Sequence, residues 1–166
     1  MHPQGVEPSR QNRVGGRRWG KPHSRTGVGS LPLDRKVGDD GVVAAAPGPV
    51  RVLVVDDQAV FRSVAQMVVE LTNGFEVAGE AASGEEAVRL AGELVPDLVL
   101  TDIKMSGIGG LEAARCILAA HRGVRVLALS TYEEYAQLAL DAGAAAFICK
   151  ADFDPDRLVT AWAAAS

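Results

Sequence analysis

The segment VRVLVVDD, residues 50–57, is the clearest indication of the fold class of this chain. Its first six residues are mostly β-branched and apolar, and polar and apolar positions do not alternate along them. A strand with one face in water alternates, whereas a strand buried on both faces reads as a continuous apolar run. Residues 50–55 are therefore predicted to be an inner strand of a parallel sheet, with Asp56 and Asp57 at its carboxyl end.

A helix is predicted directly after this strand, and Asn73-Gly74 supplies residues that commonly end a helix. Apolar residues recur here at spacings of three and four, the period of one helix face. We expect that face to be buried, and it comprises Val60, Phe61, Val64, Val68 and Leu71.

Strand and helix patterns alternate through the rest of the chain. Further strands are predicted at 75–81, 97–101, 124–130 and 144–150. The helices between and after them are predicted to follow Ser83, the loop after residue 102, about residue 132 and Asp154. Five strands alternating with five helices through short connections predict a doubly wound α/β fold, a parallel sheet with right-handed crossovers and helices on both faces.

Local signals mark the ends of two of these helices. Ser83 and Glu86 form a capping-box pattern, and Asp154-Pro155 is predicted to cap the last helix. Glu85 and Arg89 are four residues apart, so we expect them to pair on the exposed side of their helix.

Length and composition indicate one soluble domain. The 166 residues are 48% hydrophobic and 23% charged, and no apolar run reaches the roughly 20 residues needed to span a bilayer. The N-terminus lacks an export signal, so a cytoplasmic location is expected. Cys116 and Cys149 are far apart, form no metal-binding or disulfide pattern, and are expected to be buried.

The chain divides into two parts of opposite charge. Residues 1–49 hold eight Lys/Arg against four Asp/Glu, a charge of +4, and they contain Gly and Pro throughout with no apolar period. Such a segment cannot bury enough surface to offset the entropy lost on ordering, so it is predicted to be a disordered extension. Residues 50–166 hold nine basic against seventeen acidic residues, a charge of −8, and are predicted to form the domain.

Five polar residues fall at the carboxyl ends of the predicted strands: Asp56, Asp57, Asp102, Ser130 and Lys150. In a doubly wound sheet this edge holds the ligand site, next to the point where strand order reverses. Clustered carboxylates repel one another, and a hard divalent cation bound through oxygen relieves that repulsion. The set therefore predicts a magnesium site.

The same residues permit phosphoryl chemistry. We expect Asp57 and Asp102 as direct ligands of Mg²⁺, Asp56 as a ligand through water, and the backbone carbonyl of Lys104 as a further ligand. Asp102 can then act as a nucleophile on phosphorus and form an acyl phosphate. Lys150 would neutralise phosphoryl oxygens, and Ser130 would donate a hydrogen bond to one of them.

Residues 50–165 resemble the receiver domain of bacterial response regulators, on the acidic pair 56–57, on TDIKMSGIGG around Asp102, on Ser130 in ALSTY and on Lys150 in FICK. The resemblance implies a flavodoxin-like sheet of strand order 2-1-3-4-5 and phosphorylation of Asp102 by a sensor histidine kinase. It implies a phosphoacceptor signalling domain that catalyses at most its own phosphorylation and dephosphorylation. It also implies that Ser130 and Phe147 change position when Asp102 is phosphorylated, which alters the face made by helix four, strand five and helix five. That face is where a homodimer or an effector protein is expected to bind. As an aromatic residue in a strand, Phe147 is equally well explained as a core residue.

The segment LSTYEEYAQLALDAGAAAFICKAD, residues 129–152, most resembles transcription regulators that carry a C-terminal helix-turn-helix. Only sixteen residues follow Lys150, so no DNA-binding module is expected and output is predicted to be protein–protein. Tyr132 and Tyr135 are expected to pack helix four. The loop after Asp102 departs from the family at Ser106 and Gly109, which predicts a less rigid loop.

Three alternatives remain open from the sequence. A flavin mononucleotide carrier would need a hydroxyl- and Gly-rich phosphate loop after the first strand, where this chain has DDQ at 56–58. A magnesium phosphohydrolase with an aspartyl-phosphate intermediate would place its nucleophile after the first strand. A receiver that is no longer phosphorylated, or a truncated one, would act only as a protein-binding module.

Overall fold

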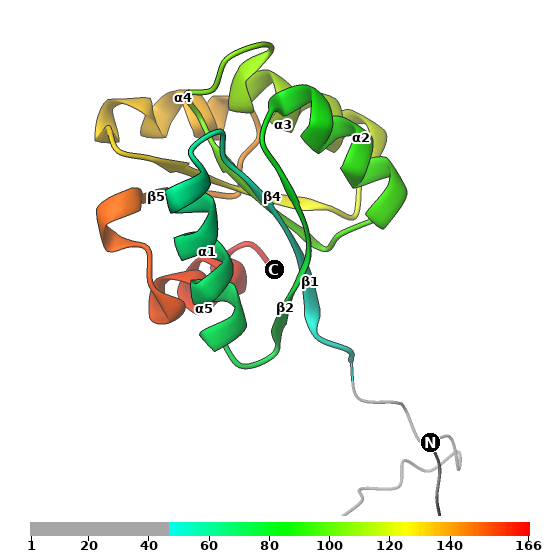
Figure 1. Ribbon diagram of the computed structural model, residues 1–166, viewed down its shortest axis with the longest axis vertical. Helices are drawn as coiled ribbons and strands as arrows, with labels where there is room; N and C mark the ends of the chain where they lie inside the picture. The colour runs from blue at the N-terminus through cyan, green and yellow to red at the C-terminus, as the bar shows by residue number, and fades with distance from the viewer. Residues whose placement is uncertain (1–46) are drawn as a thin grey trace, which may run out of the picture. The chain divides into compact units, whose positions relative to one another are not determined.

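The computed structural model describes residues 47–166, so the predicted disordered extension, residues 1–49, lies outside the described residues except for its last three. The described chain forms a five-stranded parallel sheet in the order β2-β1-β3-β4-β5, which confirms the predicted fold class and order (Figure 1). The strands are β1 Val50–Val55, β2 Phe75–Ala81, β3 Leu98–Asp102, β4 Arg125–Ser130 and β5 Ala146–Cys149. The α-helices are α1 Ala59–Leu71, α2 Gly84–Leu94, α3 Gly109–Ala120, α4 Ala136–Asp141 and α5 Pro155–Ala164.

Strand β1 lies between β2 and β3, so the strand order reverses beside it. Its side chains alternate between two hydrophobic clusters, with Leu53 and Val55 in one and Val52 and Val54 in the other. Residues of α2, α3 and α4 complete the first cluster, and residues of α1 and α5 complete the second. The continuous apolar run of the sequence therefore reflects a strand buried on both faces, as predicted.

The predicted helix caps are confirmed. The Ser83 hydroxyl accepts a hydrogen bond from the Glu86 backbone N–H at 3.2 Å, and the Asp154 carboxylate accepts one from Arg157 N–H at 2.8 Å. The expected pair of Glu85 and Arg89 is wrong. Arg89 pairs instead with Glu93 at 2.9 Å and with Glu86 at 3.8 Å.

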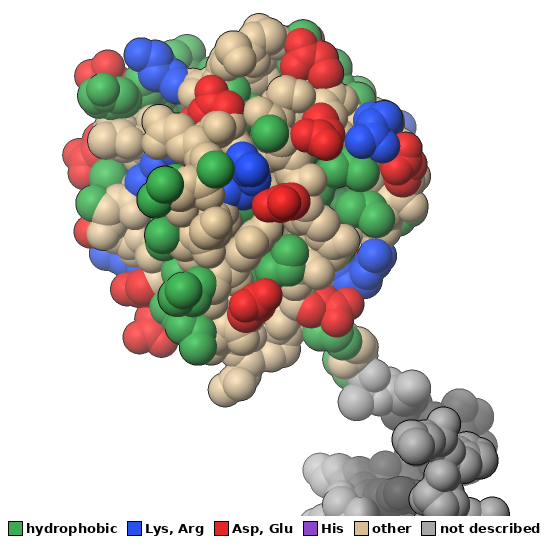
Figure 2. All heavy atoms as spheres, viewed as in Figure 1, with side chains coloured by type: hydrophobic (Ala, Val, Ile, Leu, Met, Phe, Trp, Pro, Cys, Tyr) green, Lys and Arg blue, Asp and Glu red, His purple; other side chains and the backbone are tan. Residues whose placement is uncertain are grey.

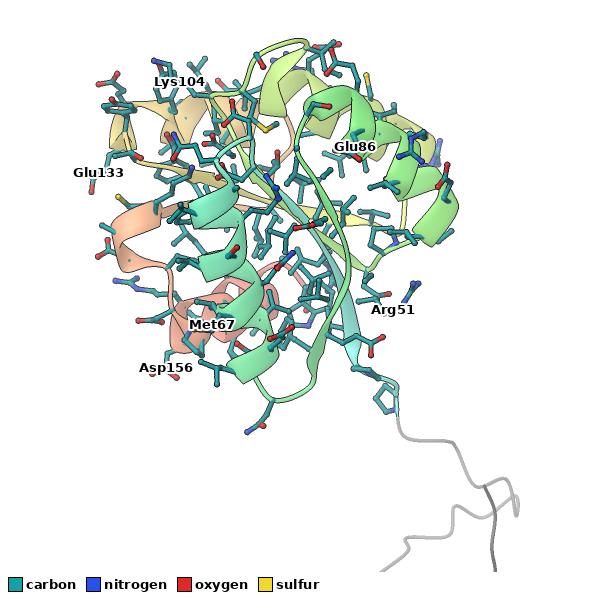
Figure 3. All side chains as sticks on the ribbon, in the orientation of Figure 1. Arg51, Met67, Glu86, Lys104, Glu133 and Asp156 are labelled. Carbon is teal, nitrogen blue, oxygen red and sulfur yellow. The ribbon has the colours of Figure 1, made fainter. Side chains whose placement is uncertain are left out.

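The buried face of α1 differs from the predicted one. Ala65, Val68 and Val69 are the buried residues of this helix, and Phe61 packs against the same cluster. The other three residues predicted to be buried are exposed, together with Met67: Val60 81%, Val64 45%, Met67 60% and Leu71 68%. Figure 2 shows apolar side chains on the face over α1, and Met67 is labelled in Figure 3. The helix is apolar on two sides. The side with Ala65, Val68 and Val69 packs against the sheet, and the second side is left in solvent.

Three side chains are more exposed than the sequence predicts. A 3-10 turn, η1 Glu133–Tyr135, precedes α4, so this helix starts after the residue 132 expected from the sequence. Tyr132 is 52% exposed, whereas Tyr135 packs against the hydrophobic cluster. Cys116 and Cys149 are both partly exposed, so the expectation that they are buried is wrong.

Candidate functional site

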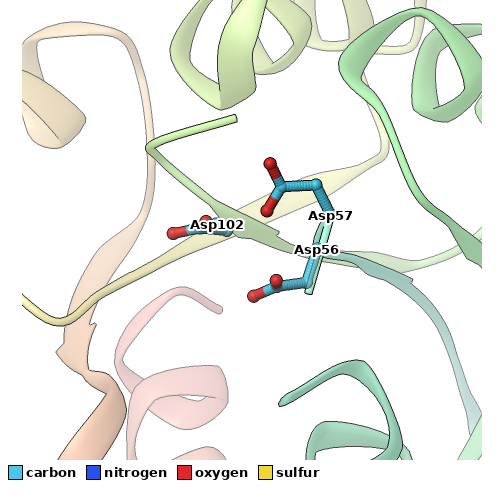
Figure 4. A group of neighbouring side chains, drawn as sticks. All are labelled: Asp56, Asp57 and Asp102. Atoms are coloured by element: carbon cyan, nitrogen blue, oxygen red, sulfur yellow. The ribbon is translucent and has the colours of Figure 1, made fainter. Parts of the chain in front are cut away.

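Three carboxylates meet at the carboxyl edge of the sheet (Figure 4). Asp56 and Asp57 follow β1 directly, and Asp102 is the last residue of β3, the neighbouring strand. One carboxylate oxygen from each lies within 4.8 Å of those of the other two, with Asp56 and Asp102 buried and Asp57 exposed. Three oxygen donors this close suit a hard divalent cation, which confirms the convergence predicted from the strand ends.

Lys150, directly after β5, supplies positive charge to this cluster. Its Nζ lies 2.6 Å from Asp56 Oδ2 and 3.4 Å from Asp102 Oδ1, and its side chain is nearly buried. The Nζ also lies 4.3 Å from the centroid of the Phe61 ring, a cation–π distance. Three carboxylates and one ammonium leave a formal charge of −2, which a divalent cation balances.

The pKa of Asp102 is raised above its ordinary value. Burial of the carboxyl group is the largest cause, the Lys150 ammonium opposes it, and the neighbouring Asp56 carboxylate adds to the rise. The carboxylate form of Asp102 is therefore held at an energetic cost that a bound cation would remove.

A cavity of about 240 Å³ opens beside Asp102. Lys104, Ser130 and Lys150 line it, so four of the residues predicted for phosphoryl chemistry border one space. Ser130 is 1% exposed, and its hydroxyl accepts a hydrogen bond from Tyr132 N–H at 3.2 Å. At about 30 Å³ for each water molecule, the cavity has room for a phosphoryl group and several waters.

Gln58, which precedes α1, and Arg62 in its first turn hold Asp56, and these roles were missed in the sequence. The backbone N–H of Gln58 donates to Asp56 Oδ1 at 2.8 Å. Arg62 donates to the backbone carbonyl of Asp56 at 2.7 Å and to Glu80 of β2 at 3.1 Å. No local pattern marks Phe61 or Arg62 as part of a site, because the partners Lys150 and Glu80 come from distant segments that the sheet brings close.

Phe147 does not border the cavity beside Asp102. It lies in β5 opposite Ala128 of β4 and packs partly buried against the hydrophobic cluster. It lines a second cavity of about 380 Å³, at the face made by α4, β5 and α5, together with Glu133, Cys149 and Arg157. Glu133 and Lys104 are both labelled in Figure 3.

The fold and the site define a flavodoxin-like α/β domain with an acidic cluster at its switch point. The family model of the response regulator receiver domain matches residues 52–163, and this chain belongs to that family. It therefore contains a receiver domain of two-component response regulators, and phosphorylation is consistent with that family role. The flavin carrier and the phosphohydrolase are set aside by this membership.

Relatives include response regulators of several types. The chain is 45% identical over 104 residues to response regulator GacA of Pseudomonas viridiflava, covering 61% of this chain and 48% of that protein. It is 39% identical over 113 residues to the chemotaxis protein CheY of Thermotoga maritima, covering 67% of this chain and 92% of that protein. The chain thus spans about half the length of the GacA relatives and nearly all of a CheY.

Solved structures agree with this membership. The signal receiver domain of the putative response regulator NarL from Mycobacterium tuberculosis matches with a TM-score of 0.64 and 33% identity, over 70% of this chain and 95% of that one. The CheX-CheY-BeF3-Mg complex from Borrelia burgdorferi matches with a TM-score of 0.60 and 29% identity, over 69% of this chain and 87% of that one. Among residues 47–166, no helix is both long and apolar enough to cross a membrane.

Proposed function

We propose that the domain of residues 50–166 receives a phosphoryl group on Asp102 from a sensor histidine kinase, in a reaction that requires Mg²⁺. The observation that carries this proposal is the approach of the Asp56, Asp57 and Asp102 carboxylates within 4.8 Å, next to the Lys150 ammonium. Asp57 and Asp102 are proposed as direct ligands, Asp56 as a ligand through water, and the Lys104 carbonyl as the fourth contributor.

In the transfer, a carboxylate oxygen of Asp102 forms a bond to phosphorus while the bond between phosphorus and the imidazole nitrogen of the kinase breaks. The imidazole leaves with the bonding electron pair. Lys150 stabilises negative charge on the phosphoryl oxygens, and the Ser130 hydroxyl donates a hydrogen bond to one of them. A bound Mg²⁺ supplies the positive charge that lets a phosphoryl group approach three carboxylates. Attack of water on the phosphorus would break its bond to the Asp102 oxygen, release inorganic phosphate and restore the carboxylate. The proposed catalysis by the domain is thus its own phosphorylation and dephosphorylation.

The phosphorylated state would be read at the face made by α4, β5 and α5. The Ser130 hydroxyl oxygen accepts a hydrogen bond from Tyr132 N–H, and its proton would donate to a phosphoryl oxygen on Asp102, which would draw the side chain toward that group. The cavity lined by Phe147 at this face offers room for the ring to change position. No helix-turn-helix lies among residues 47–166, so the proposed output of this part is binding to an effector protein or to a second copy.

The exposed apolar side of α1 is a suitable docking surface for a kinase that binds through its own helices. Val60, Val64, Met67 and Leu71 repeat at spacings of four, three and four, the spacing of a helix-packing seam. The helix begins two residues after Asp57, so a partner on this seam lies beside the acidic cluster. A cytoplasmic location follows as part of the same proposal, because it is typical for the family.

The remaining alternative is a receiver that is not phosphorylated and acts only as a protein-binding module. Incubation of the purified chain with acetyl phosphate and Mg²⁺, followed by intact-mass measurement, separates the two functions. We expect one phosphoryl adduct on the wild type and none on Asp102→Asn or on wild type with excess chelator. An unmodified wild type whose fold is intact by circular dichroism would favour the binding module.

A further inference from the structure

The loop between β3 and α3, residues 103–108, carries Lys104 and borders the acidic cluster. Its sequence offers little rigidity of its own, because Gly107 has a φ of +76° and is followed at Gly109 by a φ of +70°. Ser106 precedes them without a proline's fixed φ. Something outside the loop must therefore define its position.

Glu85, in the first turn of α2, contacts this loop directly. Its Oε1 accepts a hydrogen bond from the backbone N–H of Ile108 at 3.1 Å. Gly107 makes room for the carboxylate, since a Cβ at this position would overlap the Glu85 oxygens. Gly84 allows the same approach, because a Cβ there would lie 2.7 Å from Ile108 Cγ1 and 2.8 Å from the Gly109 carbonyl oxygen.

The opposite side of the loop has a second contact. Lys104 Nζ lies 5.4 Å from the Tyr132 ring centroid and 5.6 Å from that of Tyr135, both cation–π distances. Near its start the loop is thus held by the η1 segment and by the hydrogen bond from Ile103 N–H to the Leu129 carbonyl at 3.1 Å, and at its end it is held by α2. Of the two side-chain contacts, only that of Glu85 fixes backbone, and the backbone carbonyl of Lys104 belongs to the same short loop.

We propose that Glu85 is a positioning residue for the cation site: it fixes the backbone of the loop after Asp102 and thereby raises the affinity of the site for Mg²⁺. The proposal rests on the function proposed above, and it concerns a residue that does not itself touch the cation. Backbone hydrogen bonds of Ile103 to Leu129 and Gly110 hold the start of the loop, so the bond from Ile108 N–H to the Glu85 carboxylate restrains its other end. This bond reduces the disorder that cation binding must remove.

The test measures Mg²⁺ binding by calorimetry in four proteins. Glu85→Asp keeps the charge but is one methylene too short to reach Ile108, and Glu85→Gln loses the charge but keeps an acceptor oxygen. Glu93→Gln removes a carboxylate from the exposed end of the same helix and is the control for long-range charge. We expect Kd to rise about three- to tenfold in Glu85→Asp and to change less than about twofold in Glu85→Gln and Glu93→Gln.

Hydrogen exchange of the Ile108 amide in metal-free protein supplies a readout independent of the cation. We expect faster exchange in Glu85→Asp and near wild-type exchange in Glu85→Gln. Unchanged Mg²⁺ affinity in Glu85→Asp, or an equal loss in Glu93→Gln, would overturn the proposal. A wild type that binds no Mg²⁺ would refute the proposed function and the effect on affinity with it, whereas the contact of Glu85 with the loop would still be decided by exchange.

Discussion

Lys150 forms its shorter ion pair with Asp56, at 2.6 Å, and its longer one, 3.4 Å, with Asp102. In this state the ammonium is thus engaged mainly by the carboxylate that is proposed to reach the cation through water. Occupation of the cluster by a divalent cation would weaken the hold of Asp56 on Lys150 and free its ammonium for phosphoryl oxygens. We therefore expect the pair to link cation binding to phosphoryl binding.

The first prediction concerns removal of this ammonium. Lys150→Met should destabilise the metal-free domain by about 3–5 kcal/mol, because it removes the ammonium that neutralises two buried carboxylates, Asp56 and Asp102. Urea denaturation should show a smaller loss in the presence of Mg²⁺, which restores positive charge. Lys104→Met is the control, since Lys104 faces two aromatic rings, and its loss should be about 1 kcal/mol or less. Equal losses with and without Mg²⁺ would argue against a shared cation site.

The raised pKa of Asp102 predicts an unusual pH dependence of stability. The folded state binds the Asp102 proton more tightly than the unfolded state does. The free energy of unfolding therefore falls as pH rises from 3.8, the ordinary pKa of the group, through its raised pKa in the folded state. Above that window the ionised Asp102 destabilises the metal-free domain. The domain regains this lost stability as pH falls back below the pKa of Asp102 in the folded state.

Asp102→Asn isolates this contribution. The variant should be more stable than wild type at neutral pH without metal, by on the order of 1 kcal/mol, because a buried charge is removed from beside Asp56. The difference should shrink toward pH 4 and also on addition of Mg²⁺ to the wild type. Denaturation curves at several pH values measure both effects, and a difference that grows toward acid pH would contradict the raised pKa.

Gly110 tests how closely α3 approaches the acceptor residue. A Cβ at Gly110 would overlap the backbone carbonyl of Asp102. Gly110→Ala should therefore cost about 1–3 kcal/mol of stability through overpacking, and it should also reduce phosphorylation by acetyl phosphate. Gly123→Ala is the matched control, because no atom lies within 4 Å of the Cβ it would add. Equal effects of the two substitutions on thermal unfolding would show that α3 can shift without cost.

Val95 stores strain away from the site. It ends α2 with a φ of 46° and a ψ of 63°, a left-handed conformation that a β-branched residue adopts only at a cost. Val95→Gly should raise the free energy of unfolding by about 1 kcal/mol. Val159→Gly, at a similarly exposed position inside α5, should lower it by about the same amount. Chemical denaturation of both variants should give opposite signs.

The sheet, its helices and the meeting of the five polar residues at one edge could all be predicted from the amino-acid sequence. These follow from local regularities: the continuous apolar run of 50–55 requires burial on both faces, and parallel strands must end at a common edge. Asp56, Asp57, Asp102 and Lys150 could therefore be grouped before any contact was known. The Ser83 and Asp154 caps are equally local, since each acts on a residue three positions away.

The buried side of α1 and the partner of Glu85 follow instead from contacts between distant segments of the folded chain. The apolar pattern of α1 fits two faces, and contact with the sheet chose the one with Ala65 and Val69. Glu85 bonds to Ile108, twenty-three residues away, in preference to the helical neighbour that spacing suggests. Such choices depend on surfaces that exist only once distant segments pack, because a side chain exchanges a weak exposed pair for a contact that the fold brings within reach.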